Sequence, residues 1–133
     1  TYYMISKICT LILIVFLSSS CSNDSDKEDN QTLKDIIIEV VLFEFTPDTG
    51  NNTLRLRYEI KFTNPNDTAI KGFYKITTTA DGLETTMLST TDTPCYEIDA
   101  NSDCILRFDE EDSLDLARIN SIVLNEVVYT ISE

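Results

Sequence analysis

From residue 35 onward, apolar and polar side chains alternate along the chain with a period of two. The clearest stretch is TLRLRYEIKFT (residues 53–63), in which Leu, Leu, Tyr, Ile and Phe alternate with Arg, Arg, Glu, Lys and Thr. Such alternation gives a β-strand one buried face and one solvated face. The stretch is therefore predicted to be a strand whose apolar side lies in the core.

Six further segments are rich in β-branched and aromatic residues and are bounded by turn-forming residues, which is typical of short strands. They are residues 35–45, 69–79, 83–90, 95–98, 104–108 and 121–131. Between the last two, EEDSLDLARI (110–119) is expected to form one helical turn, because its acids precede its basic residue as a helix dipole favours. About seven short strands predict an all-β fold, an immunoglobulin-like antiparallel β-sandwich.

The second and third predicted strands are separated by NPNDT (64–68), which favours a hairpin that pairs residue i with residue 132 − i. In this register Phe62 faces Ile70 and Tyr58 faces Tyr74, so both apolar faces are buried together. In an immunoglobulin topology, by contrast, these two strands lie in different sheets.

Residues 1–20 have the parts of a secretory signal peptide, with the true start expected at Met4. Lys7 precedes an apolar run (8–17), and three serines follow the run. The run is too short for a permanent membrane-spanning helix. The protein is therefore expected to be exported.

The motif LSSSC (17–21) resembles the lipobox of bacterial lipoproteins, although Ser18 stands where that family prefers leucine. This resemblance implies that Cys21 is acylated and begins the mature chain; the alternative is a cleaved signal in which Cys21 is incidental. The following SNDSDKEDN (22–30) resembles the acidic tethers of Bacteroidota lipoproteins, and its KED resembles their surface-export signal. The expected location is the cell envelope, as an outer-membrane lipoprotein, with a periplasmic or surface-facing orientation left open.

The residues after Cys21 agree with a tether, because residues 22–32 carry no apolar side chain and cannot offset the entropy of ordering. The expected organisation is a signal peptide (1–20), a lipidated cysteine with a flexible acidic tether (21–34) and a β-sandwich domain (35–133). Within the last, residues 54–82, with their Asn-Pro-Asn tripeptide, resemble the water-stress and hypersensitive-response domain of late-embryogenesis-abundant proteins. That resemblance implies a seven-stranded sandwich and no particular function.

Charge and composition exclude several classes of function. All 23 acidic residues lie after position 20, against 10 basic residues in the whole chain, so a nucleic-acid partner is not expected. The chain has no histidine, which removes the usual general base and the commonest zinc ligand. No catalytic residue, metal site or cofactor is predicted.

Cys95 and Cys104 flank a polar turn. If residues 95–98 and 104–108 form a hairpin that pairs residue i with residue 199 − i, the two cysteines face each other. In an exported protein this predicts a disulfide, with two reduced core thiols as the alternative. The nearby DEEDSLD (109–115) could bind calcium, but it lacks the Asp-x-Asp-x-Asp-Gly spacing, which favours a solvated acidic turn.

Two three-residue patterns, DTA (67–69) and DSL (112–114), resemble the O-glycosylation signal of Bacteroidota exported proteins. The resemblance implies modification of Thr68 and Ser113.

A stripe of basic residues occupies the outward positions of the second and third strands. In the predicted hairpin Lys61 lies opposite Lys71, an unfavourable pairing of like charges. One interpretation is a docking face for an anionic partner such as a glycan or a lipid headgroup; the other is a solvated face answered by acids elsewhere. The stripe comprises Arg55, Arg57, Lys61, Lys71 and Lys75, with an exposed Phe73.

These features favour a non-enzymatic binding or assembly module, held on a membrane by its lipid, that presents a β-sandwich to a protein or glycan partner. One alternative is an inhibitor or immunity-type lipoprotein. The other is a carboxylate-dependent glycan hydrolase, which requires two acids about 5 to 10 Å apart in a cleft. Buried acids would favour the enzyme and solvated acids the binder.

Overall fold

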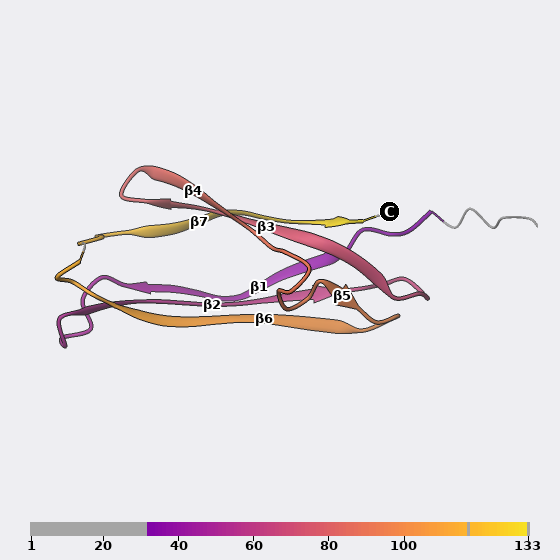
Figure 1. The fold of residues 1–133 in the computed structure, drawn as a ribbon, viewed down its shortest axis with the longest axis horizontal. Helices are drawn as coiled ribbons and strands as arrows, with labels where there is room; N and C mark the ends of the chain where they lie inside the picture. Colours follow the sequence, from indigo (N-terminus) through magenta and orange to yellow (C-terminus); the bar gives the residue numbers. More distant parts are fainter. Residues whose placement is uncertain (1–31, 117, 133) are drawn as a thin grey trace, which may run out of the picture. The chain divides into compact units, whose positions relative to one another are not determined.

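The computed structural model describes residues 32–116 and 118–132. From Leu33 onward the chain forms one folded unit of seven antiparallel strands (Figure 1), which confirms the predicted all-β fold and number of strands. The strands are β1 (Ile37–Thr46), β2 (Thr53–Thr63), β3 (Ile70–Ala80), β4 (Leu83–Leu88), β5 (Glu97–Ile98), β6 (Asp103–Ser113) and β7 (Ile122–Ile131).

The strands form two packed sheets. One sheet has the order β1-β2-β6. In the other, β3 is central: β4 and β7 pair with it on opposite sides, and the two-residue β5 pairs with its first residues. Figure 1 shows β3, β4 and β7 in one layer and β1, β2 and β6 in the other. The architecture is a β-sandwich in which β4 (6 residues) and β5 (2 residues) are the shortest strands.

The core lies between the sheets and is built from the alternating apolar positions that the sequence predicted. Ile60 and Phe62 of β2 are fully buried, and Tyr74 and Ile76 of β3 are nearly so. The ring of Phe62 stacks on Tyr74 with centroids 5.5 Å apart, and Tyr129 of β7 lies 5.3 Å from the same ring. The inner faces of β2 and β3 therefore meet across the sandwich.

The predicted hairpin between β2 and β3 is wrong. β2 pairs with β1 and β6, whereas β3 belongs to the other sheet, so the chain crosses from one sheet to the other after Thr63. Instead of facing Tyr58, Tyr74 packs on Phe62 from the opposite sheet. Two alternating strands can bury their apolar faces equally well side by side or face to face, so alternation alone does not distinguish these arrangements.

The crossing is held by a buried asparagine, which explains the Asn-Pro-Asn tripeptide. Asn64 is completely buried. Its Oδ1 accepts hydrogen bonds from the backbone N–H and the Nδ2 of Asn66 (3.0 and 2.9 Å), and Asn66 exchanges two more with the backbone of Lys34. The Nδ2 of Asn64 donates to three carbonyl oxygens, those of Thr68, Ile98 and Asp99.

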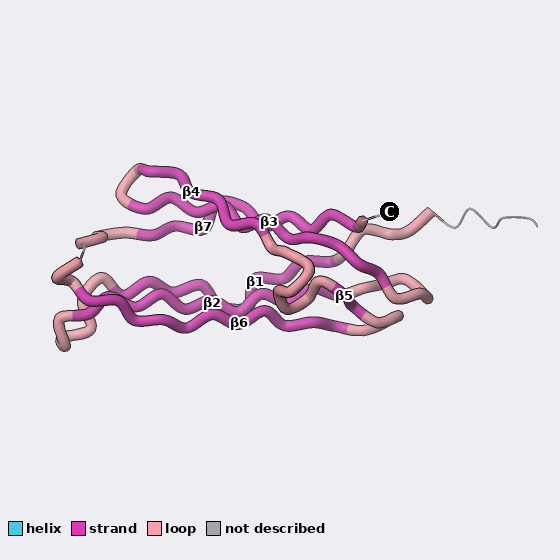
Figure 2. The backbone as a smooth tube through the Cα atoms, in the orientation of Figure 1, coloured by secondary structure: helices cyan, strands magenta, loops and turns pink. Residues whose placement is uncertain are grey.

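The helical turn predicted at residues 110–119 is also wrong. β6 continues to Ser113, a turn occupies Leu114–Leu116, and Figure 2 shows only strand and loop in the described part of the chain. The reason is the partner strand: β2 pairs with β6 along its whole length, from Thr53 opposite Ser113 to Thr63 opposite Asp103. The backbone hydrogen bonds of this pairing outweigh the weak dipole preference.

Candidate functional site: a cleft between two edge strands

A cavity of about 310 Å³ opens between the two sheets, at the edge formed by β4 and β6. Its size falls in the range of ligand-binding pockets. One wall comes from β2 and β6, the other from β3 and β4. The lining residues are Leu56, Tyr58 and Phe108 on the first wall, and Ile76, Thr78, Thr85, Thr86 and Met87 on the second.

The cleft exists because inner-face side chains of β4 are left uncovered. Met87 lies opposite Ile76 and therefore on the inner face of its sheet, yet 41% of its surface is exposed. All six residues of β4 are exposed. Within the described residues β4 pairs only with β3, and β6 only with β2. Two edge strands thus border an apolar surface that a closed sandwich would bury.

The turn between β3 and β4 is tied to the loop before β7. Asp81 and Gly82 form a two-residue turn, both with positive φ (46° and 87°), as a tight hairpin requires. The Asp81 carboxylate accepts hydrogen bonds from the backbone N–H groups of Asn120 and Ser121. The Asn120 hydrogen bond is the main cause of a lowered pKa at Asp81. The end of β4 nearest this turn is therefore held in place.

Tyr58 lies at the floor of the cleft, and its hydroxyl group has only a weak hydrogen-bond acceptor among the described residues. Its ring stacks on Phe108 (centroids 4.8 Å apart) and on Phe43 (6.2 Å), and only 7% of the residue is exposed. Within the described residues its hydroxyl makes one hydrogen bond, to the Met87 sulfur at 3.9 Å, and a thioether is a weak acceptor. Burial raises the pKa of Tyr58 to about 12, so the hydroxyl stays protonated and can donate a hydrogen bond to a ligand.

Two acids extend the wall of the cleft on β6. Glu110 and Asp112 lie opposite Leu56 and Leu54, on the inner face of their sheet, and both are exposed. The charge of Glu110 also contributes to the raised pKa of Tyr58, after burial and Tyr74. The inner faces of β2 and β6 carry no basic residue. This end of the cleft is therefore negative.

The six residues of the predicted basic stripe do not share a face. Arg55, Arg57 and Lys61 lie on the outer face of β2, whereas Lys71, Phe73 and Lys75 lie on β3 in the other sheet. The prediction of one docking face for an anionic partner is wrong because it depended on the hairpin that does not form.

Each basic residue of the stripe forms an ion pair with an acid on a neighbouring strand. The contacts are Arg55 with Asp109 (2.7 Å), Arg57 with Glu44, Lys61 with Glu39 (3.1 Å), Lys71 with Glu97 (3.7 Å) and Lys75 with Glu126 (3.0 Å). The hydrogen bond between Arg55 and Asp109 raises the pKa of the first and lowers that of the second. These are solvated cross-strand pairs, the alternative interpretation of the stripe. Phe73 instead packs beside Tyr96, with ring centroids 5.3 Å apart.

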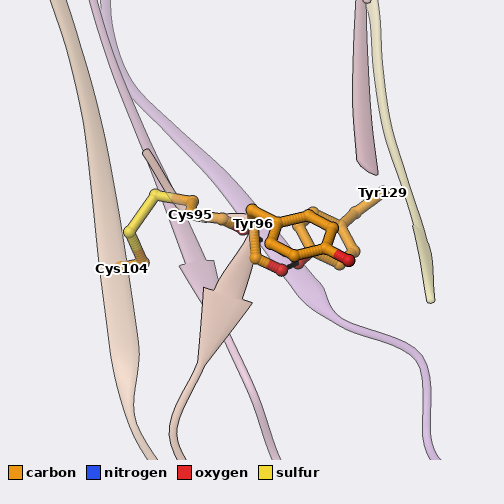
Figure 3. The surroundings of a disulfide bond; sticks show 4 residues. All are labelled: Cys95, Tyr96, Cys104 and Tyr129. Carbon is orange, nitrogen blue, oxygen red and sulfur yellow. Dashed lines mark hydrogen bonds between the residues drawn. A yellow bond between two sulfur atoms is a disulfide. The ribbon is translucent and has the colours of Figure 1, made fainter. Parts of the chain in front are cut away.

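Cys95 and Cys104 form a disulfide, with Cα atoms 5.6 Å apart (Figure 3). The predicted pair is thus bonded, but the predicted hairpin is wrong: Cys95 lies in the loop before β5, which pairs with β3, whereas Cys104 lies in β6. The bond therefore links the two sheets. Beside it the Tyr129 hydroxyl donates to the carbonyl oxygens of Cys95 and Tyr96 (2.9 and 3.3 Å).

The other predicted sites are scattered. Thr68 is exposed in the crossing loop, while Ser113 is half-buried at the end of β6, where its Oγ accepts a hydrogen bond from the N–H of Asp115. Cys21, the signal peptide and nearly all of the tether lie outside the described residues.

The acids of DEEDSLD lie mostly on β6 and do not gather around a common point. Over residues 32–116 and 118–132 no cluster of His, Cys, Asp or Glu is arranged to hold a metal ion. Every Asp and Glu in those ranges is exposed or half-buried. The same ranges contain no helix of the length and apolarity needed to span a membrane.

The cleft was not predicted from the sequence, although a signal for it was present. Leu106, Phe108, Glu110 and Asp112 alternate along β6 and all point to the inner face. Acids at inner positions indicate where the core ends. The predicted strand stopped at residue 108, so this signal was assigned to a helical turn.

Comparison with known proteins gives no relative: no family model, no curated protein and no solved structure matches this chain.

Proposed function

We propose that this chain is an exported, lipid-anchored and non-catalytic binding module that holds an envelope partner protein in the cleft between β4 and β6. The anchor follows from the sequence, in which a signal-like leader ends at LSSSC and an acidic tether follows Cys21. An inhibitor or immunity-type protein would be one form of such a module.

One observation carries the binding role: apolar inner-face residues of both sheets remain open to solvent in one cleft. Exposed Met87 and half-buried Phe108 both line the cleft, and among the described residues the hydroxyl of Tyr58 has only the Met87 sulfur as an acceptor. Leaving such a surface uncovered costs about 25 cal/mol per Å² of apolar area. A partner that covers the cleft recovers this free energy, which is the usual meaning of an open apolar patch.

The acids beside the cleft favour binding over hydrolysis. A carboxylate-dependent hydrolase needs an acid secluded enough to stay protonated near neutral pH. Glu110 and Asp112 are both exposed on the rim. On the rim they are placed to attract a cationic group of a partner.

Site-specific photo-crosslinking in living cells tests this function. A photoreactive side chain at Thr85, which lines the cleft, should give a covalent adduct with another protein. The same side chain at Thr130, exposed on β7, is the matched control and should give none. Equal adducts from both positions, or none from Thr85, would contradict the proposal.

A further inference from the structure

The strand β4 is the least protected of the sheet edges in the described part of the chain. β1 has a register shift between Val40 and Leu42, and β7 has one opposite Thr77 and Thr78. β6 carries inward acids, and β5 has only two residues. Such devices discourage another strand from pairing with an edge. β4 pairs in unbroken register with β3, and it contains no proline and one charged residue, Glu84.

A strand added to the free edge of β4 would direct every second side chain into the cleft. Thr85 and Met87 already point that way, and side chains next to them on an added strand would do the same. Beside Met87 the opposite wall is Phe108 and Tyr58. The position next to Met87 therefore suits an apolar side chain. The Tyr58 hydroxyl can donate to a polar atom of the incoming segment, because its present acceptor is weak.

Towards the turn after β3 the opposite wall becomes acidic. Met87 lies opposite Ile76, and Thr85 opposite Thr78, one step nearer that turn. On the facing sheet, the inner-face residues of β6 that follow one another towards the same end of the sandwich are Phe108, Glu110 and Asp112. Within the described residues, neither of these two acids forms an ion pair. The position next to Thr85 therefore suits a basic side chain.

Charge also selects the source of the strand. A second copy of this chain would present β4, which has an acid and no basic residue, or β6, which has five acids and one arginine. Neither strand offers a surplus of basic side chains that could face Glu110 and Asp112. The whole chain carries a formal charge of −13. The complementary strand therefore belongs to a different, basic partner.

We infer that the cleft takes an extended segment of a partner protein, which pairs with β4 as an added strand. The segment places an apolar side chain beside Phe108 and a basic side chain at Glu110 and Asp112, two positions apart on one face. Main-chain hydrogen bonds hold it in register, and the cleft reads alternate side chains. This inference rests on the proposed function and specifies the chemistry of its partner.

The test measures binding of synthetic peptides to the full chain in detergent micelles by fluorescence anisotropy. The probe peptide has threonine at every second position. The positions between the threonines, whose side chains would enter the cleft, are two valines followed by a lysine. Its matched controls replace lysine by glutamate, or both valines by serine. The probe should bind at least about tenfold more tightly than either control at low ionic strength, and added salt should reduce the charge preference.

Protein variants locate the site. Replacing both acids, Glu110→Gln with Asp112→Asn, should lower the affinity for the probe about fivefold to tenfold, and Met87→Glu should abolish binding. The control pair Glu97→Gln with Glu126→Gln removes the same charge from β5 and β7, where the two acids pair with Lys71 and Lys75 outside the cleft, and should leave affinity unchanged. Equal weakening by both pairs would overturn the inference, because it would indicate only a general attraction of cations.

Backbone chemistry distinguishes strand addition from other binding. Alternate N–H groups of an extended peptide point to opposite edges, and only one edge can pair with β4. N-methylation of the groups on that edge should abolish binding, whereas N-methylation on the other edge should leave binding intact. If peptides methylated on either edge still bind, or if an alkylammonium ion binds as tightly as the probe, the peptide does not bind as an added strand and the inference is wrong. If the lysine and glutamate peptides bind equally and the Thr85 cross-link still forms, this inference fails and the proposed function stands. If no peptide binds and no cross-link forms, both fail.

Discussion

A single buried amide decides how the chain passes between the sheets. The side chain of Asn64 has two N–H donors and one acceptor oxygen, and all of them are used. The tripeptide around it was predicted to be a simple turn because asparagine and proline are common in turns. The sequence could identify the break between strands, but not the burial of the amide, which depends on the end of β5 at Ile98 and Asp99, far along the chain.

Asn64→Ala should lower the free energy of unfolding by about 3 kcal/mol or more, because it leaves several buried polar groups without partners. Urea denaturation followed by circular dichroism measures the loss. Asn51→Ala is the control, because Asn51 is exposed in a loop, and should change stability by less than about 0.5 kcal/mol. Similar small losses for both variants would show that the Asn64 network does not hold the crossing.

Two tyrosines should make the fold sensitive to alkaline pH. Burial raises the pKa of both Tyr58 and Tyr129 to about 12, from a value of about 10 in unfolded chains. A group with a raised folded pKa contributes stability below its unfolded pKa and loses it as pH rises through the folded value. Stability should therefore decline between about pH 10 and pH 12.

Tyrosine absorbance against pH gives the check on this prediction. In wild type, part of the tyrosinate signal should appear only near pH 12, and Tyr58→Phe with Tyr129→Phe should remove that part. Ionisation of all tyrosines near pH 10 in the folded protein would contradict it.

At the scale of elements, periodicity predicted where the strands lie but not how they pair. The alternation in β2 determines which side chains are buried, and Ile60 and Phe62 are indeed at the centre of the core. Pairing depends on contacts between distant segments, such as β2 with β6. In each case the sequence favoured a hairpin, because two strands joined by a short turn can pair through local contacts alone. Both predicted hairpins, across residues 64–68 and across 99–100, were therefore wrong, although the strands themselves are present.

The disulfide acts as a link between elements of different sheets. Its loop is short, with the cysteines nine positions apart, so the chain-entropy estimate gives about 2 to 3 kcal/mol of stabilisation. Replacing both cysteines by serine should lower the free energy of unfolding by that amount in chemical denaturation. The chain should still fold, because most of the buried core comes from other residues, such as Ile60, Phe62 and Tyr74. Unchanged stability of the double variant, or of the reduced wild type, would contradict this role.

At the scale of the whole molecule, the proposed lipid anchor and tether would present the acidic sandwich away from a membrane surface. Cys21→Ser should abolish incorporation of labelled fatty acid and leave an unprocessed precursor, because serine cannot form the thioether to the lipid. Radiolabelled palmitate with membrane fractionation measures both effects. Cys9→Ser, within the leader, is the matched control and should leave labelling intact. Persistent labelling of the Cys21 variant would refute the anchor.

The all-β sandwich of the described residues was predicted from the sequence, whereas the candidate site was not. All-β character is encoded locally by alternation in each segment. The cleft arises from what is missing at one edge: β4 has no neighbour beyond β3 among the described residues, and the inner face of β6 changes from Phe108 to Glu110. Such an opening depends on how two sheets end relative to each other, which no single segment encodes.

Residue-resolved amide hydrogen exchange tests the central claim, that the cleft beside β4 is the binding site. The full chain in micelles is measured alone and saturated with the valine–lysine probe peptide. Backbone amides of Leu83–Leu88 on the free edge should exchange rapidly alone and become protected at least about tenfold by the peptide, because they gain strand hydrogen bonds. Amides on the free edge of β1 should not change. Protection of β1 or β7 instead of β4, or no protection at a saturating peptide concentration, would contradict the account.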